Sequence, residues 1–551
     1  MAIHKRAGQV AIQQDLVNIP KLMSCYYCIS PDIKMAEQRV SFGTSGHRGC
    51  AFNANFNEPH ILAITQAVVD YRNSAGILGA LYLGIDTHAL SQAAYISAVE
   101  VLAANKIQVI VHQDDGFTPT PVVSHAIVVA NKHVEQSVDG LIITPSHNPP
   151  QDGGIKYNPP HGGPAEGEIT QWIEQRANQY LKDELKGVNR INYRQAIDSS
   201  LVEPVDLIAP YVNDLTSVVD MKAIADAGIR IGVDPLGGSG IYYWDKIAAR
   251  YGINIELVNE SVDPRFGFMP LDKDGKIRMD CSSPYAMAGL LKHQEQFDLC
   301  VGNDPDYDRH GIVCPGSGLM NPNHFLAVAI DYLITHRPLW SDELVIGKTL
   351  VSSSMIDKVC AQHRRVMSEV PVGFKWFVDG LANASFAFGG EESAGASFLR
   401  RDGTTWCTDK DGFILALLAA EILAVTGKTP AERYTELVAE HGESFYTRVD
   451  SPVTAEKKNK FAELIAADVD MNLLGTNNLA GENIQHVMTR APGNNANIGG
   501  IKVVTENAWF AARPSGTEAL FKIYGESFIS QDHLKLVISE AQSIIDRMLK
   551  N

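Results

Sequence analysis

Long apolar runs and cysteines are scarce in this sequence. The longest apolar stretch, residues 413–425, contains Glu421 and is shorter than the roughly 20 residues that cross a bilayer, so it predicts a buried helix. The eight cysteines are scattered and form no disulfide framework, and Cys25 and Cys28 make one C-x-x-C that we interpret as two reduced thiols. The opening stretch MAIHKRAGQVAIQQDL lacks the apolar core of a secretory signal. We therefore expect a cytoplasmic protein that makes no membrane contact.

Positive charge is scarce as well. The 551 residues include 47 lysines and arginines against 64 aspartates and glutamates, which gives a formal net charge of -17. Binding to nucleic acid depends on basic groups that neutralise phosphates, so this composition argues against a nucleic-acid partner. An anionic substrate must therefore be held by local basic residues.

Short apolar runs rich in β-forming residues alternate with longer helical patterns along most of the chain. ALYLGID is followed by SQAAYISAVEVLAANK and IQVIVH, and IRIGVD, INIELVN and FDLCVGND come later. This alternation predicts α/β units with largely parallel sheets, in which ligands bind beyond the carboxyl ends of the strands. Turn-rich segments divide the chain into four expected domains, 1–203, 204–318, 319–430 and 431–551.

The first polar loop, TPSHNP, follows the apolar run LII. Ser146 at a strand end suits a nucleophile or a phosphate carrier. The loop lacks the G-x-S-x-G elbow of an α/β-hydrolase and His147 directly follows the serine, so a Ser-His-Asp triad has little support. Pro145 and Asn148 also favour a plain turn, and both interpretations stay open at this point.

The second loop, GNDPDYDRHG, has Asp304, Asp306 and Asp308 at alternate positions. In an extended segment such residues project to one side, so the three carboxylates are expected to converge. Clustered anions repel one another unless a cation lies among them, and oxygen ligands suit Mg²⁺ or Ca²⁺. An EF-hand loop would need Gly where the chain has Arg309. The loop predicts a metal site of another kind, with a solvated acidic turn as the alternative.

The third loop, FGGEESAGAS, follows the apolar run 386–388. Its glycines allow the backbone to approach a ligand closely, and Glu391 and Ser393 offer oxygens that bind sugar hydroxyl groups. Acidic residues also favour the first turn of a helix, so a helix N-cap is an equal alternative.

The fourth loop, ARPSGTEALFK, combines a planar cation with hydroxyl groups and a glycine. Arg513, Ser515, Gly516 and Thr517 match the needs of a phosphate cradle, with an ordinary turn as the alternative. A fifth segment, GTSGHRG, adds Arg48 near the N-terminus, which suits either a phosphate contact or a turn.

Taken in this order, the five segments resemble the α-D-phosphohexomutase superfamily along nearly the whole chain. TPSHNP is similar to its phosphoserine loop, DPDYDR to its metal loop, GEESAG to its sugar-binding loop and RPSGT to its phosphate-binding loop. TPSHNPPQDGGIKYNPP, VGFKWF and TDKDG resemble most its bacterial glucose-specific branch. Pro145 replaces the Ala that commonly precedes the active serine. No His follows the sugar-loop glycine, which argues against mannose or glucosamine specificity.

The resemblance implies an α/β protein of four domains around a central cleft, with three tandem α/β domains of mixed sheets and a smaller C-terminal α+β domain. It implies a cytoplasmic isomerase that interconverts glucose 1-phosphate and glucose 6-phosphate through a phosphoserine and glucose 1,6-bisphosphate, with one Mg²⁺ per chain. The residues that match the superfamily's motifs are Ser146, His147, Lys410, Arg48 and Arg309 for catalysis, Glu391, Ser393, Arg513, Ser515, Gly516 and Thr517 for substrate binding, and Ser146, Asp304, Asp306 and Asp308 for the metal.

Two other functions stay open at the level of sequence. A metal-dependent phosphatase would use the same loops but transfer the phosphoryl group of Ser146 to water. A non-catalytic phosphosugar-binding scaffold is less expected, because Ser146, the three aspartates and Lys410 occur together. Either His147 or Lys410 suits the acid or base. The first forty residues are expected to pack on the first domain or to support a homodimer, and the last domain to hinge.

Overall fold

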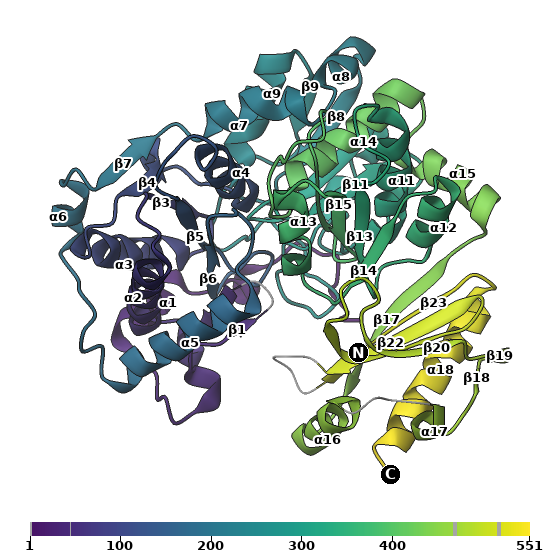
Figure 1. Cartoon of the computed structure of the whole chain (residues 1–551). Coiled ribbons are helices and arrows are strands. Elements are labelled where there is room, and N and C mark those ends of the chain that lie inside the picture. Colours follow the sequence, from purple (N-terminus) through teal and green to yellow (C-terminus); the bar gives the residue numbers. More distant parts are fainter. Residues whose placement is uncertain (1–2, 44–45, 467–470, 515–519, 551) are drawn as a thin grey trace.

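The computed structural model describes residues 3–43, 46–466, 471–514 and 520–550, which form four main sheets in chain order (Figure 1). The first three sheets mix parallel and antiparallel pairs, and the fourth is antiparallel. This arrangement confirms the predicted three α/β domains followed by a smaller α+β domain.

The first sheet has seven strands in the order β1-β2-β6-β5-β3-β4-β7. Its centre is parallel, and β6 returns antiparallel to β5. The apolar sequences LYLGI and DGLII form β3 and β5, because strands covered on both faces favour continuous apolar runs. The strands are β1 (Phe42–Gly43), β2 (Gly46–Cys50), β3 (Leu81–Ile85), β4 (Val109–His112), β5 (Asp139–Ile143), β6 (Asp152–Asn158) and β7 (Val202–Val205). The helices are α1 (Ile19–Cys28), α2 (Glu58–Ala75), α3 (Ser91–Ala104), α4 (Thr120–Ala130), α5 (Gly167–Lys182) and α6 (Tyr193–Ile197).

The second and third sheets share one feature that bears on function. In each, a buried strand of the parallel part turns back as an antiparallel hairpin, β10 with β11 and β15 with β16. These hairpins carry the DPDYDR and GEESAG segments. The strands are β8 (Arg230–Asp234), β9 (Asn254–Leu257), β10 (Leu299–Asn303), β11 (His310–Cys314), β12 (Gly318–Leu319), β13 (Val345–Thr349), β14 (Met367–Val370), β15 (Phe386–Glu391) and β16 (Gly395–Phe398). The helices are α7 (Ile208–Asp214), α8 (Met221–Ala227), α9 (Ile241–Tyr251), α10 (Ala288–Leu291), α11 (Pro322–His336), α12 (Met355–Gln362), α13 (Val378–Ala382), α14 (Gly412–Thr426) and α15 (Pro430–His441).

The fourth sheet has the order β17-β23-β22-β21-β20, and the long helix α18 packs against β23 and β22. Helix α18 buries residues at helical spacing, among them Leu534, Val537, Ile538 and Ala541. The strands are β17 (Phe445–Pro452), β20 (His486–Arg490), β21 (Asn497–Val504), β22 (Ala508–Pro514) and β23 (Leu520–Ser527), with a separate ribbon of β18 (Asn478–Leu479) and β19 (Glu482–Asn483). The helices are α16 (Ala455–Ala466), α17 (Met471–Leu474) and α18 (Gln531–Met548).

The apolar stretch predicted as a buried helix is α14, which confirms that expectation. The side chain of Asp411 caps its first turn, and Gly427 ends it in the left-handed conformation. The buried Glu421 inside α14 accepts two hydrogen bonds from Arg337, at 2.7 and 3.0 Å, so its charge is paired. Within the described ranges no single helix is long and apolar enough to cross a membrane. Helices α14 and α15, which are bent relative to each other, have the required length and apolar composition only when they are counted together.

Two of the expected domain boundaries fall inside elements of secondary structure. The one after residue 203 lies within β7, which pairs with β4 of the first sheet. The one after residue 430 lies at the start of α15, which packs on α11 of the third domain. We propose boundaries near residues 206 and 442 for these two positions.

The N-terminal extension joins the first two domains. Leu22 and Tyr26 of α1 are fully buried in the core of the first domain. Further upstream, the backbone N–H of Ala11 donates to the carbonyl of Met269 at 3.0 Å, and that of Leu271 donates to Gln9 at 2.9 Å. The extension therefore packs on the first domain, as expected, and also pairs with the second.

Strand β6 passes very close to the loop that follows β5. The Thr144 N–H donates to the Gly154 carbonyl at 2.9 Å, and a Cβ added to Gly154 would lie 2.0 Å from the Thr144 carbonyl oxygen. Glycine at this position therefore fixes how closely the TPSHNP loop lies on the sheet.

We expect Gly154→Ala to lower the free energy of unfolding by about 1–3 kcal/mol, because the added methyl group has no room against the loop backbone. Urea unfolding measures this change. Gly289→Ala is the matched control, since its added Cβ meets nothing closer than 3.9 Å. A Gly154→Ala variant as stable as the Gly289→Ala control would contradict this close approach.

Candidate active site

Ser146 lies in the loop after β5 and is fully buried. Its backbone has φ of 60°, a left-handed conformation that a non-glycine residue adopts only when its surroundings support it. Here the Ser146 N–H donates to the Thr144 hydroxyl oxygen at 2.8 Å. The Ser146 hydroxyl in turn donates to Oδ2 of Asp304 at 2.8 Å, across the boundary between the first and second domains.

Asp304, Asp306 and Asp308 come together in the turn between β10 and β11. One oxygen of each lies within 4.8 Å of the others, and all three residues are buried. The expected extended geometry is wrong, because Tyr307 has φ of 60° and its N–H donates back to the Asp304 carbonyl at 2.9 Å. In an extended segment the first and last of these residues would be about 13 Å apart, too far to share one ion. The turn is what makes the cluster.

The oxygens of this cluster suit a divalent cation. Oδ1 of Asp306 and Oδ1 of Asp308 are buried and accept no hydrogen bond from any described residue. A buried acceptor without a partner costs free energy, and a hard cation such as Mg²⁺ removes that cost. Burial raises the pKa of Asp304 well above its usual value, and the charges of Asp306 and Asp308 raise it further. A cation among the three would reverse this shift.

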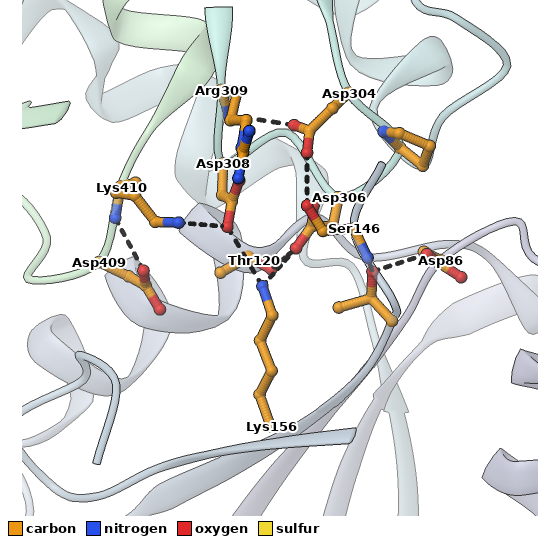
Figure 2. Close-up of polar contacts among 12 residues, drawn as sticks. Asp86, Thr120, Ser146, Lys156, Asp304, Asp306, Asp308, Arg309, Asp409 and Lys410 are labelled. Carbon is orange, nitrogen blue, oxygen red and sulfur yellow. Dashed lines mark hydrogen bonds and ion pairs between the residues drawn. The ribbon is translucent and has the colours of Figure 1, made fainter. Parts of the chain in front are cut away.

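Two lysines from different parts of the chain pair with the aspartates (Figure 2). Nζ of Lys410 lies 2.7 Å from Oδ2 of Asp308, and Nζ of Lys156 lies 2.5 Å from Oδ2 of Asp306 and 3.2 Å from Oδ2 of Asp308. Burial lowers the pKa of Lys156, but the charges of Asp306 and Asp308 raise it more, so the net shift is upward. Both lysines offset the negative charge of the cluster.

Lys156 was missed in the sequence. It lies in β6 between Ile155 and Tyr157, and a lone lysine in a strand usually indicates a solvent-exposed position. The signal that could have identified Lys156 was its place inside the run GGIKYN, which is buried, because a buried lysine is rare unless it is paired. Thr120, whose hydroxyl donates to Oδ2 of Asp306 at 2.8 Å, was missed for a related reason, since it begins α4 far from the DPDYDR segment.

The two expected arginines also lie at this site. The backbone N–H of Arg309 donates to Oδ1 of Asp304 at 3.0 Å, and its Nε is 3.7 Å from Oδ1 of Asp308. Arg48, on β2, donates from Nη1 to Oδ1 of Asn148 at 3.4 Å, next to the TPSHNP loop. Positive charge therefore approaches Ser146 from both the first and the second domain.

His147 is adjacent to the serine in space as well as in sequence. Its Nδ1 lies 3.1 Å from Oγ of Ser146, and its carbonyl accepts from Met279 at 3.3 Å. Asp280 approaches His147 and Arg309 from the second domain, and although burial raises its pKa, those two neighbours lower it below its ordinary value. The sequence did not indicate Asp280, because it lies between β9 and α10 in a stretch without regular structure.

The sugar-loop residues lie in the turn between β15 and β16. Glu391 is buried, and its Oε1 accepts from the Gly373 N–H at 3.1 Å. Burial raises the pKa of Glu391 to about 7, with Lys410 and Arg309 opposing the shift and Glu392 and Asp308 adding to it. Ser393 is partly exposed in the same turn. A Cβ on Gly395 would lie 2.3 Å from Cδ of Lys410, so this loop packs directly against that lysine.

Arg513 lies near the end of β22, opposite Lys522 of β23. No contact between described residues joins Arg513 to the aspartate cluster. Ser515, Gly516 and Thr517 lie outside the described residues.

Comparisons with known proteins identify relatives over nearly the full length. The domains I, II and III of the phosphoglucomutase/phosphomannomutase family match residues 39–184, 209–317 and 321–441. A phosphoglucomutase of Komagataeibacter xylinus is 53% identical over 543 residues, 98% of this chain and 97% of that protein.

Solved structures share the fold at lower identity. The open form of the Paramecium phosphoprotein pp63/parafusin, a phosphoglucomutase, has a TM-score of 0.72 with 20% identity, over 94% of this chain and 95% of that one. An N-acetylphosphoglucosamine mutase of Aspergillus fumigatus, solved with GlcNAc-6P and magnesium, has a TM-score of 0.51 with 14% identity, over 94% of this chain and 100% of that one. The matched domains and the near full-length relative together place this chain in the phosphoglucomutase/phosphomannomutase family.

Proposed function

We propose that the chain is a phosphoglucomutase, an isomerase that interconverts glucose 1-phosphate and glucose 6-phosphate through a phosphoserine and glucose 1,6-bisphosphate. The observation that carries this function is the 2.8 Å contact between the Ser146 hydroxyl and Asp304, at a buried carboxylate cluster in which two oxygens accept no hydrogen bond from the described residues. The 53% identity to a phosphoglucomutase supports glucose as the sugar.

Mg²⁺ is the cation that we propose for the cluster, held by Asp304, Asp306, Asp308 and an oxygen of phosphorylated Ser146. When bound, it would neutralise charge that develops on the transferred phosphoryl group. Buried oxygen donors are the ligands that this ion prefers, and a mutase of the same fold was solved with magnesium.

In the proposed reaction, the bond between phosphorus and Oγ of Ser146 breaks as the free hydroxyl oxygen of the sugar forms its own bond to phosphorus. Arg48, Arg309 and Lys156 stabilise the three charged oxygens during transfer. The sugar hydroxyl gives up its proton, and Oγ of Ser146 gains one. Nδ1 of His147 lies 3.1 Å from Oγ of Ser146, which supports His147 as the group that exchanges a proton with the serine. Lys410 contacts the sugar loop, which supports it as the group that exchanges a proton with the sugar hydroxyl.

The bisphosphate then turns and returns its other phosphoryl group to Ser146, which completes the isomerisation. Glu391 and Ser393 would hold sugar hydroxyls in both orientations, and Arg513 with Ser515, Gly516 and Thr517 would hold the phosphate that is not reacting. A phosphatase would need water at the phosphoserine. The contact of the sugar loop with Lys410, which pairs with Asp308 of the cluster, favours transfer to a bound sugar instead.

The first test is Ser146→Ala in a coupled assay of glucose 6-phosphate formation, with Mg²⁺ and a trace of glucose 1,6-bisphosphate. We expect activity to fall by on the order of 10³-fold or more, because no phosphoryl carrier remains. Free phosphate is recorded in the same reactions. Phosphate as the main product of the wild-type protein would indicate a phosphatase, and an active Ser146→Ala variant would refute the proposed carrier.

The second test measures the cation without catalysis. Mg²⁺ should raise the thermal unfolding midpoint of the wild-type protein, since a ligand that binds the folded state stabilises it. Asp306→Asn should remove this increase, because one of the three carboxylates that would hold the ion is gone. Asp298→Asn, at a partly exposed site in the same domain, is the control and should respond to Mg²⁺ as the wild type does. Equal responses of both variants would argue against the cluster as the site.

The third test concerns pH. With a pKa of about 7, Glu391 is increasingly protonated below neutral pH and then loses acceptors for sugar hydroxyls. Since only the ionised fraction binds fully, KM for glucose 1-phosphate should fall by about tenfold between pH 6 and pH 8. Glu391→Gln stays neutral and should keep only the trend due to the substrate phosphate. Parallel KM profiles for the two proteins would rule out Glu391 as the titrating group.

A further inference from the structure

A buried pair, Asp86 and His88, lies beneath the TPSHNP loop and has no part in the reaction described above. Asp86 directly follows β3, and His88 precedes α3. Both side chains are completely buried, with Nδ1 of His88 2.8 Å from Oδ2 of Asp86. Burial opposes the charge on His88, but the carboxylate of Asp86 raises its pKa above the ordinary value. The pair is therefore an ion pair on the rigid corner between a strand and a helix.

All four acceptor positions of the Asp86 carboxylate are in use. Oδ1 accepts from the backbone N–H of His88 at 2.9 Å and from the Ser91 hydroxyl at 2.6 Å. Oδ2 accepts from Nδ1 of His88 at 2.8 Å and from the Thr144 hydroxyl at 2.6 Å. An amide in its place offers one oxygen and two donors, so it could not serve the same four partners.

Asp86 controls the loop through Thr144. A hydroxyl group has one proton, and the proton of Thr144 is committed to Asp86. Its lone pair is therefore directed to the N–H of Ser146, which donates to it at 2.8 Å. This N–H belongs to the residue with the left-handed backbone that carries the reactive hydroxyl. The orientation of one hydroxyl thus connects the ion pair to the conformation of Ser146.

His88 holds the other side of the same loop. Its Nε2 lies 3.0 Å from the carbonyl oxygen of Asn148, so each ring nitrogen faces an acceptor and the ring carries both protons. The ring of Phe266, from the second domain, covers it at a centroid distance of 4.9 Å. The hydroxyl of Thr87, between the two paired residues, donates to the Gly237 carbonyl at 2.7 Å. The corner that holds the loop is therefore also fixed to the second domain, which supplies Asp304.

We propose that Asp86 and His88 are positioning residues that hold the loop from Thr144 to Asn148 at both ends, so that Ser146 stays aligned with the aspartate cluster for phosphoryl transfer. The inference rests on the proposed role of Ser146 as phosphoryl carrier. Neither residue is expected to touch the substrate. Their loss should therefore lower kcat and leave KM nearly unchanged, because a displaced carrier reduces the rate of transfer and not the binding of the sugar.

The chain offers a matched control for this proposal. Ser91 donates to the same carboxylate from the same buried environment as Thr144. It does not contact the loop through any hydrogen bond of the described residues. Ser91→Ala and Thr144→Val each remove one buried hydrogen bond to Asp86, but only Thr144→Val releases the N–H of Ser146. A purely structural role predicts the same kinetic effect for both substitutions.

The experiment compares the full-length wild-type protein with Thr144→Val, Thr144→Ser, His88→Gln and Ser91→Ala. For each protein, kcat and KM for glucose 1-phosphate, the thermal unfolding midpoint and amide hydrogen exchange of a peptide covering 144–150 are measured. Thr144→Val and His88→Gln should lower kcat by on the order of 10²-fold, with KM within about threefold of wild type. Exchange in this peptide should be faster in both. Thr144→Ser, which keeps the hydroxyl, should recover kcat to within about threefold, and Ser91→Ala should keep kcat despite a lower midpoint.

Three results would overturn the proposal: wild-type kcat in both Thr144→Val and His88→Gln, a loss of kcat in Ser91→Ala as large as that in Thr144→Val, or no recovery in Thr144→Ser. His88→Gln tests the Asn148 side independently if Thr144→Val does not fold. Failure of the positioning proposal can be distinguished from failure of the proposed function. An active Ser146→Ala variant would refute the role of Ser146 as phosphoryl carrier. An inactive Ser146→Ala variant beside fully active Thr144→Val and His88→Gln variants would refute only the positioning role.

Discussion

The compensation of buried negative charge is the constraint on which the rest of this structure depends. Burying a carboxylate costs several kcal/mol even after the protein relaxes, and a cluster of three adds mutual repulsion. The cations that offset this cost come from different domains. Lys156 belongs to the first, and Lys410 precedes α14 after the third sheet. The ion pairs of the site therefore also hold three domains together around the turn after β10.

Because the loops of three domains contact one another, each loop can be short and still be held in place. TPSHNP, DPDYDR and GEESAG each follow a buried strand, so a sheet fixes the start of each segment, and each segment contacts a residue from another part of the site. Ser146 reaches Asp304 from the first domain, and Lys410 touches both Asp308 and the sugar loop. A phosphorylated Ser146 would bring nearly two more negative charges to this place. Lys156, Lys410, Arg48 and Arg309 are the cations that would offset this charge.

Local patterns in the sequence were sufficient to predict the strands and the polar loops that follow them. In LII followed by TPSHNP, for example, the signals for a buried strand and for a turn lie within a few residues of each other. They were insufficient wherever the answer depended on distant parts of the chain. The convergence of Asp304, Asp306 and Asp308 was expected for a geometric reason that proved wrong, because the left-handed Tyr307 replaces extension with a turn. Lys156 acquires its role only because β6 runs antiparallel to β5, beside a turn 150 residues away in sequence. The same limit applies to β7, which rejoins the first sheet after two intervening helices.

The fourth domain is attached in a different way from the other three. Lys502 on β21 pairs with Glu369 on β14 at 3.0 Å, and Glu526 on β23 accepts from the Ser354 N–H at 2.7 Å. A small apolar cluster that includes Leu350 and Trp509 completes the interface. Lys502 and Glu369 are both buried, so this interface also contains a buried ion pair, but no hydrogen bond of the described residues joins the fourth domain to the aspartate cluster. In the proposed reaction the bisphosphate must turn while one phosphate stays bound. An anchor carried by the fourth domain would be independent of the ion pairs of the cluster, whereas Ser146 and the aspartates cannot separate without exposing buried charge.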